Sequence, residues 1–249
     1  MPLHSFMQTA LIAAIFFLAG TVKGMTGMGL PTVAMGGLGV FMAPVEAAAL
    51  IVVPTFVTNV WQLLTGPSLA KLVARLSLML VGIVIGTIAG AGMLTGADTA
   101  LTAVGLGVAL ALYAAIGLLA RPFRVPARAE RWLSPLIGLV TGLVTGGTGV
   151  SAVPTAPYLQ ALALDRDDLI QALGLCFTVA TIALAIGLAR GGAFHLGELT
   201  ASSLAVAPAF LGMWSGQAAR KRISPAAFRR FFLVCLLVLG GALALRPLL

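Results

Sequence analysis

Long apolar runs follow one another along almost the whole chain, separated only by short polar interruptions. Each run is bounded by charged residues or by clusters of glycine and proline, and together the runs form two series of five segments. The first series covers residues 6–22, 30–42, 47–65, 76–94 and 99–120. The second series covers residues 133–145, 152–163, 169–189, 197–219 and 226–245.

The solvent for most of these segments is lipid. Of 249 residues, 60% are hydrophobic and only 9% are charged, which is more apolar surface than a soluble core can bury. A helix needs about 20 mostly apolar residues to cross the hydrocarbon core. The runs are continuous rather than alternating in polarity, so they indicate helices and not the strands of a membrane barrel. The sequence predicts an all-α integral membrane protein.

The two series of segments resemble each other at an offset of 122 residues. They share a G-x3-G-x-T-G pattern, formed by Gly20, Gly24, Thr26 and Gly27 and by Gly142, Gly146, Thr148 and Gly149. Further matches follow in the same order: Glu46 with Asp168, Thr55 and Thr58 with Thr178 and Thr181, and Gly86 and Gly90 with Gly212 and Gly216. Collinear matches predict a duplication, with a first repeat over residues 1–120, a connector over 121–131 and a second repeat over 132–249.

The basic residues predict how the chain is oriented. The net charge of +8 comes mainly from short loops, so it indicates topology rather than a nucleic-acid partner. If the connector is cytoplasmic, the N-terminus is outside and only Arg190 and Arg246 fall clearly on the outer side. Twelve residues fall inside: Lys71, Arg75, Arg121, Arg124, Arg128, Arg131, Arg166, Arg220, Lys221, Arg222, Arg229 and Arg230. Five segments per repeat then make the two repeats inverted.

Glycine-rich interruptions at residues 24–29 and 146–151 occupy matching places in the two repeats. Segments 30–42, 133–145 and 152–163 have about a dozen residues, so the first two segments of each repeat are expected to be short or re-entrant. A proline, Pro31 or Pro154, follows each interruption and suits the first turn of a helix. We therefore expect two helix N-termini to face each other near the middle of the membrane and to hold an anion.

The predicted binding residues lie at these breaks and on one face of the third segment. Glycine lets a ligand approach the backbone, and threonine adds a hydroxyl donor. The predicted substrate-binding residues are Lys23, Gly24, Thr26, Gly27, Gly29, Asn59, Gln62, Gly146, Gly147, Thr148, Gly149 and Ser151. Three alternatives remain open: the glycines only allow close helix packing, Asn59 and Gln62 only join helices, and Lys23 is a lysine of the cytoplasmic surface.

Other classes of function find little support in the sequence. The chain has no G-x4-G-K-[ST] phosphate loop, and its two histidines are far apart, so we expect no enzyme, no metal and no cofactor. Cys176 and Cys235 lie in apolar runs and indicate no disulfide. Glu46 and Asp168 open the third segment of each repeat, where an acid stabilises the helix dipole or, alternatively, serves a coupling proton or cation.

The motifs at residues 20–31 and 142–154, the acids that open the next helices, the central basic loop and the glycines before Arg222 resemble the TauE/SafE family. This family is also called the sulfite exporter or DUF81 family. The resemblance covers essentially the whole chain and implies a bacterial inner-membrane transporter for sulfite, thiosulfate or organosulfonates, often working outward. We expect a secondary transporter or facilitator in which the inverted halves rock around the site, with a proton or sodium ion as a possible coupling ion. An anion channel and a non-transporting subunit that anchors an enzyme complex are the alternatives.

Overall fold

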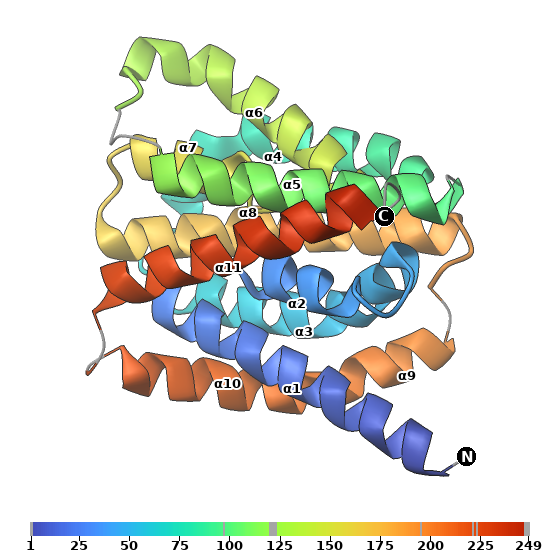
Figure 1. Cartoon of the computed structure of the whole chain (residues 1–249). Helices are drawn as coiled ribbons and strands as arrows, with labels where there is room; N and C mark the ends of the chain where they lie inside the picture. The colour runs from blue at the N-terminus through green and yellow to red at the C-terminus, as the bar shows by residue number, and fades with distance from the viewer. Residues whose placement is uncertain are drawn as a thin grey trace.

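The computed structural model describes residues 2–96, 98–119, 124–194, 196–220, 222 and 224–246. Within these ranges the chain is all-α, as predicted, and the helices lie side by side in one elongated bundle (Figure 1). The helices are α1 (Pro2–Thr26), α2 (Leu30–Leu38), α3 (Pro44–Leu64), α4 (Leu69–Gly96), α5 (Thr99–Leu119), α6 (Ala127–Thr148), α7 (Thr155–Ala161), α8 (Arg166–Arg190), α9 (Leu196–Leu204), α10 (Val206–Ala219) and α11 (Pro225–Leu245).

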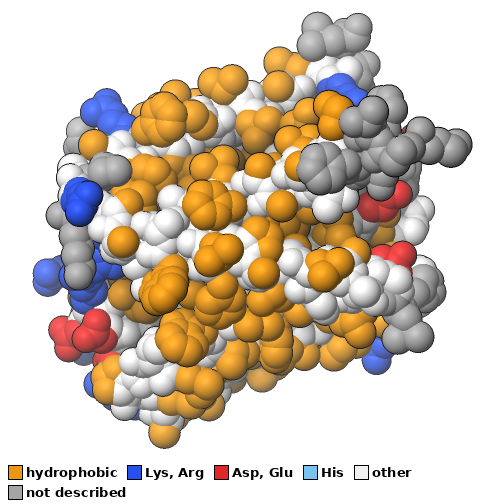
Figure 2. Space-filling view, turned by 90° about the horizontal axis from the view of Figure 1, so that it is seen from below, with side chains coloured by type: hydrophobic (Ala, Val, Ile, Leu, Met, Phe, Trp, Pro, Cys, Tyr) orange, Lys and Arg blue, Asp and Glu red, His pale blue; other side chains and the backbone are white. Residues whose placement is uncertain are grey.

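Six helices in the described part of the chain are long and apolar enough to cross a membrane. They are α3, α4, α5 and α8, together with the parts of α1 from Met7 and of α11 from Ala227. Hydrophobic side chains cover most of the face seen in Figure 2, and most of its Lys and Arg side chains lie at the left edge. A long apolar belt with charges gathered at its ends is typical of a multi-pass membrane protein.

Basic side chains gather at one end of the bundle. Ion pairs join the first turns of α4 to those of α6 and α8, and a shared pocket joins the start of α8 to the end of α10 and the start of α11. Arg190 and Arg246 end α8 and α11, so they lie at the opposite end. We call the first end the basic end. The predicted separation of charges is confirmed for the described residues, and the predicted Arg121 and Lys221 lie outside them.

The prediction of short segments holds for only part of the chain. Helices α2 and α7 have 9 and 7 residues, as expected for short segments. The segment predicted at residues 133–145 is instead the 22-residue helix α6, and α1 has 25 residues, so neither first segment is short. Charged residues in the first turns of α6, among them Glu130, hide its beginning from a hydropathy pattern. The predicted connector over 121–131 therefore overlaps α6, and its residues 121–123 lie outside the described ranges.

Two prolines shape the helices around α9. The segment predicted over residues 197–219 divides at Ala205, because Pro208 has no N–H to bond the carbonyl of Leu204 and its ring crowds that oxygen. Within α3, Pro54 likewise leaves the carbonyl of Leu50 without its helical donor. The buried hydroxyl of Ser202 in α9 donates to this oxygen at 2.7 Å and accepts from the Val53 N–H at 3.0 Å. Ser202 of α9 thus supplies the donor that the Leu50 carbonyl lacks within α3.

Glycines hold two helix pairs in backbone contact. A methyl group on Gly20 or Gly24 of α1 would collide with the carbonyl oxygens of α10 residues Ala209 and Met213. In return, Gly212 and Gly216 of α10 meet the carbonyl oxygens of α1 residues Phe17 and Thr21. The same four contacts join α6 to α4: Gly142 to Ile83, Gly146 to Thr87, Gly86 to Leu139 and Gly90 to Leu143. The two sets are equivalent. Adding 122 to each α1 residue number gives its counterpart in α6, and subtracting 126 from each α10 residue number gives its counterpart in α4.

These pairs interlock the two halves of the sequence. The first helix of each half packs on the fourth segment of the other half, since α1 contacts α10 and α6 contacts α4. Helix α5 packs on α11, and α3 packs on α8. The halves are therefore not separate bodies in space, so the expectation that they rock against each other as units does not fit this arrangement.

Candidate functional site

The first break ends α1 and begins α2. Gly27 adopts a left-handed conformation with φ of 80°, and its N–H donates to the Lys23 carbonyl at 2.7 Å. The Thr26 hydroxyl donates to the Met28 carbonyl at 2.8 Å and accepts from the Met28 N–H at 3.3 Å. Gly29, with φ of 100°, is the N-cap of α2, and a proline follows in the first turn as predicted.

The second break repeats this geometry at the end of α6. Gly149 has a φ of 73°, and its N–H donates to the Thr145 carbonyl at 2.8 Å. The Thr148 hydroxyl accepts from the Val150 N–H at 3.2 Å. The prediction for Pro154 is wrong in detail, because this proline is the N-cap of α7 and does not lie in its first turn. In both breaks the threonine hydroxyl bonds the backbone of its own turn.

The two breaks lie at opposite ends of α2 and do not face each other. The carbonyl of Gly27, just before α2, accepts a hydrogen bond from Gln62 at 2.9 Å. Gly149 instead lies against Met35, in the last turns of α2. The first break also borders the pocket at the basic end, so it does not lie at the middle of the bundle. The structure therefore does not form the single two-break cradle expected from the sequence.

Five of the six glycines of the predicted site divide into two groups. Gly24 and Gly146 lie inside helices and pack on the backbones of Met213 and Thr87, which is the packing alternative. Gly27, Gly29 and Gly149 have positive φ and form the turns. Gly147 belongs to neither group. It follows Gly146 in the sequence, and a methyl group added to it would lie 4.0 Å from the Met93 sulfur. Ser151 follows the second turn and is buried.

Lys23 is buried inside the bundle although it lies near the basic end. Its side chain is only 3% exposed, so it is not a lysine of the surface. Its ammonium group donates a hydrogen bond to the Asn59 carboxamide oxygen. It forms no salt bridge with any residue that the structure describes. A buried ammonium group with one neutral acceptor lacks most of the compensation that a buried charge needs.

The polar face predicted on α3 points inward, as expected. Thr55, Thr58, Asn59 and Gln62 are at most 7% exposed. The Gln62 amide donates to the carbonyls of Gly27 and Ile170, both at 2.9 Å, so it joins α3 to α8 and to the first break. The Asn59 Nδ2 and the Thr55 hydroxyl have no hydrogen-bond partner among the described residues. Lys23 and Asn59 therefore form the part of the predicted site whose polar groups are still unsatisfied.

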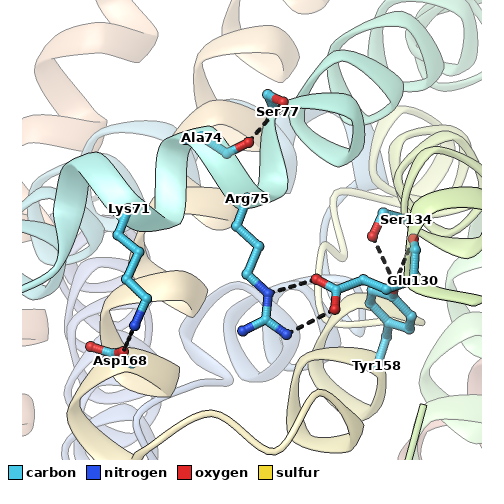
Figure 3. Close-up of polar contacts among 8 residues, drawn as sticks. All are labelled: Lys71, Ala74, Arg75, Ser77, Glu130, Ser134, Tyr158 and Asp168. Carbon is cyan, nitrogen blue, oxygen red and sulfur yellow. Dashed lines mark hydrogen bonds and ion pairs between the residues drawn. The ribbon is translucent and has the colours of Figure 1, made fainter. Parts of the chain in front are cut away.

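The predicted capping acids begin α3 and α8. Glu46 is exposed in the first turn of α3, and Asp168 is in the first turn of α8 with Lys71 at 3.9 Å. Figure 3 shows Arg75 directed at Glu130, whose carboxylate accepts two hydrogen bonds at 2.7 and 2.8 Å. The hydroxyl oxygens of Ser134 and Tyr158 lie 2.7 Å apart in a hydrogen bond beside this pair. These contacts join α4, α6, α7 and α8 at the basic end.

A pocket of about 360 Å³ borders the first break. Thr26 contributes to its lining, and so do Arg166, Arg220 and Arg229 from the ends of three other helices. The sequence predicts only the orientation of the chain from these arginines, because they lie in separate segments and share no motif. In the described ranges, no group of three or more His, Cys, Asp or Glu side chains is arranged to hold a metal.

One comparison with known proteins identifies relatives of this chain. The model of the family described as "Sulfite exporter TauE/SafE" matches residues 12–243. A search of curated proteins and a search of solved structures each gave no match.

Proposed function

The protein belongs to the TauE/SafE sulfite exporter family, since the match spans nearly the whole chain, and we propose that it carries small sulfur-containing anions across the bacterial inner membrane. The anions are sulfite, thiosulfate or organosulfonates, and the protein works as a secondary transporter or facilitator in the outward direction. The basic end faces the cytoplasm, in accordance with the positive-inside rule.

The buried pair of Lys23 and Asn59 carries this proposal. Lysine has no acceptor, so the carboxamide oxygen of Asn59 must face the ammonium group and the Nδ2 donor must point elsewhere. The pair then offers an ammonium group with unused donors and an amide N–H2 group without a partner. An oxyanion accepts from both groups and supplies the missing negative charge. We place the anion here rather than between the two breaks.

The reciprocal glycine contacts support an inverted repeat and suggest which parts move. Close backbone contact along Gly20 and Gly24 ties α1 to α10, and the equivalent contacts tie α4 to α6. In our proposal these interlocked pairs, and not the sequence halves, shift around the anion as the site opens to alternate sides. Coupling of this movement to a proton or a sodium ion stays a prediction.

A transport assay in liposomes tests the function. Purified protein is reconstituted, and the movement of labelled sulfite, thiosulfate and methanesulfonate is followed together with counterflow. Saturable counterflow is expected for a carrier, whereas flux without counterflow indicates a channel. An absence of flux with stable co-purification of another protein would favour the anchoring subunit instead.

The variant Lys23→Met tests the site. Methionine is similar in size and apolar, and replacing a buried charge in this way is often neutral or stabilising, so the variant is expected to fold. We expect transport to fall at least about tenfold, because a charge-assisted hydrogen bond contributes about 1.5–3 kcal/mol. The exposed Lys71→Met is the matched control at the same end of the bundle. Equal transport by the Lys23→Met variant and the wild type would refute the proposed site.

A further inference from the structure

The pocket beside the first break is built from side chains of five helices and one helix cap. Thr26 ends α1, Tyr113 belongs to α5, and Gln160 lies in the last turn of α7. Arg166 begins α8, and Arg229 lies in the second turn of α11. Gln160 and these two arginines are exposed, so a small solute reaches the pocket from the basic end. Arg220, at the C-cap of α10, is the third cation of the lining.

The positive charge of this pocket is not compensated within its lining. The side chains of Arg166, Arg220 and Arg229 form no salt bridge or hydrogen bond with any residue in the described ranges, and no acid lines the pocket. The neighbouring Asp165 and Asp167 are exposed and lie outside the lining.

Two cations of α4 at the basic end do have acidic partners. Arg75 is held by Glu130 through two hydrogen bonds, and Lys71 lies beside Asp168 (Figure 3). The pocket arginines differ from these two cations of α4 in lacking an acidic partner among the described residues. Guanidinium groups bind oxyanions through paired N–H donors, and the Gln160 amide and the Tyr113 hydroxyl add neutral donors. The volume of about 360 Å³ lies within the range of small-molecule sites.

Thr26, which lines the pocket, is close to the buried Lys23 along α1. Lys23 lies three residues before Thr26 on α1, on nearly the same face and about 4.5 Å deeper along the helix axis. The Thr26 edge of the pocket is thus about one helical turn from Lys23.

We propose that this pocket is a capture site for sulfur oxyanions, which it concentrates at the basic end before they pass to Lys23. This inference rests on the proposed function and adds a second anion site to it. Uncompensated positive charge at the mouth of a cleft raises the local concentration of anions and their rate of entry.

Direct binding to the purified, full-length protein tests the capture site independently of transport. Calorimetry with thiosulfate is carried out in nanodiscs of phosphatidylcholine, using the background variant Lys23→Met so that only the pocket is titrated. The double change Arg220→Gln and Arg229→Gln is compared with the single change Arg230→Gln. Arg230 is the matched control, because it is the next residue of α11, is exposed and does not line the pocket.

We expect the double change to weaken thiosulfate binding at least about tenfold and the control to leave it unchanged. In vesicles of known orientation with Lys23 intact, the double change should raise the half-saturating concentration at the basic end by a similar factor. The value at the opposite end should stay the same. Unchanged binding in the double variant would overturn the capture site while leaving the proposed function intact. Thiosulfate binding without any transport would overturn the proposed function while leaving the capture site intact.

An anionic lipid headgroup presents the same oxyanion chemistry as a free anion. Nanodiscs that contain phosphatidylglycerol distinguish the two sources. A capture site for free anions keeps its thiosulfate affinity in these discs. Loss of thiosulfate binding there, together with phosphatidylglycerol that co-purifies with the wild type but not with the double variant, would show a lipid site and overturn the proposal.

Discussion

Asn59 accepts a hydrogen bond from the buried ammonium group of Lys23, while its own Nδ2 has no partner in the described part of the structure. This pairing predicts the effect of Asn59→Asp. The new carboxylate becomes the counter-ion of Lys23 and repels an incoming anion, so transport should fall at least about tenfold.

Thermal stability of the Asn59→Asp variant should stay equal or rise, because the buried lysine gains an opposite charge. Transport and the unfolding midpoint in detergent are measured on the same preparation. Wild-type transport with raised stability would show that the pair is structural and that the anion binds elsewhere.

Glycine contacts between α4 and α6 predict a second, purely structural outcome. The change Gly90→Ala brings a methyl group against the carbonyl of Leu143 and should destabilise the protein by about 1–3 kcal/mol. Gly92→Ala is the matched control on the same helix, because a methyl group added there would meet no atom within 4 Å beyond the nearby backbone of its own helix. Its effect should be neutral or slightly stabilising. Unfolding in mixed micelles measures both changes, and equal stabilities would contradict the close helix contact.

The bend at Pro54 predicts a role for Ser202. The change Ser202→Ala leaves the Leu50 carbonyl without a donor and should cost about 1–3 kcal/mol of unfolding free energy. Ser203→Ala is the control, since this exposed neighbour bonds only within its own helix, at 2.7 Å to the Leu199 carbonyl. In the background Pro54→Ala, the helix supplies its own N–H to Leu50. In that background Ser202→Ala should lower the unfolding free energy by less than it does in the wild type. An equal loss in both backgrounds would refute this explanation.

The left-handed turns predict an asymmetry between the two breaks. Gly27→Ala has room for its methyl group, so only the positive φ opposes it, at roughly 1–2 kcal/mol. Gly149→Ala carries the same strain and also places its methyl group 2.9 Å from the Met35 sulfur. The second change should therefore destabilise more than the first. Gly27→Asn should be tolerated better than Gly27→Ala, and the reverse order in thermal unfolding would contradict the left-handed assignment.

Most of the fold follows from hydropathy, because lipid requires each apolar segment to be a helix. Hydropathy did not reveal the beginning of α6, because its first turns carry the charged residues Arg128, Glu130 and Arg131 at the basic end. Offsets between the matched glycines anticipated which residues are equivalent. They did not reveal that Gly24 contacts Met213, because an offset relates two copies of a motif and says nothing about which surfaces touch.

The structure brings some residues of the predicted site together and keeps others apart, and their binding of substrate stays a prediction. Lys23 and Asn59 meet as a pair, yet in the sequence they were separate candidates. The two breaks share a local pattern, but α2 separates them in space. The cluster of Arg166, Arg220 and Arg229 was not predicted, since its members come from three helix ends far apart in the sequence.

The contact of Gly20 with Ala209 joins residues near the two ends of the chain. During synthesis, the glycine face of α1 therefore enters the membrane long before α10 exists to cover it. Helix α6, in contrast, finds α4 soon after it is made. The contact of α1 with α10 therefore forms only late in synthesis, and a chain interrupted before α10 leaves α1 without its partner.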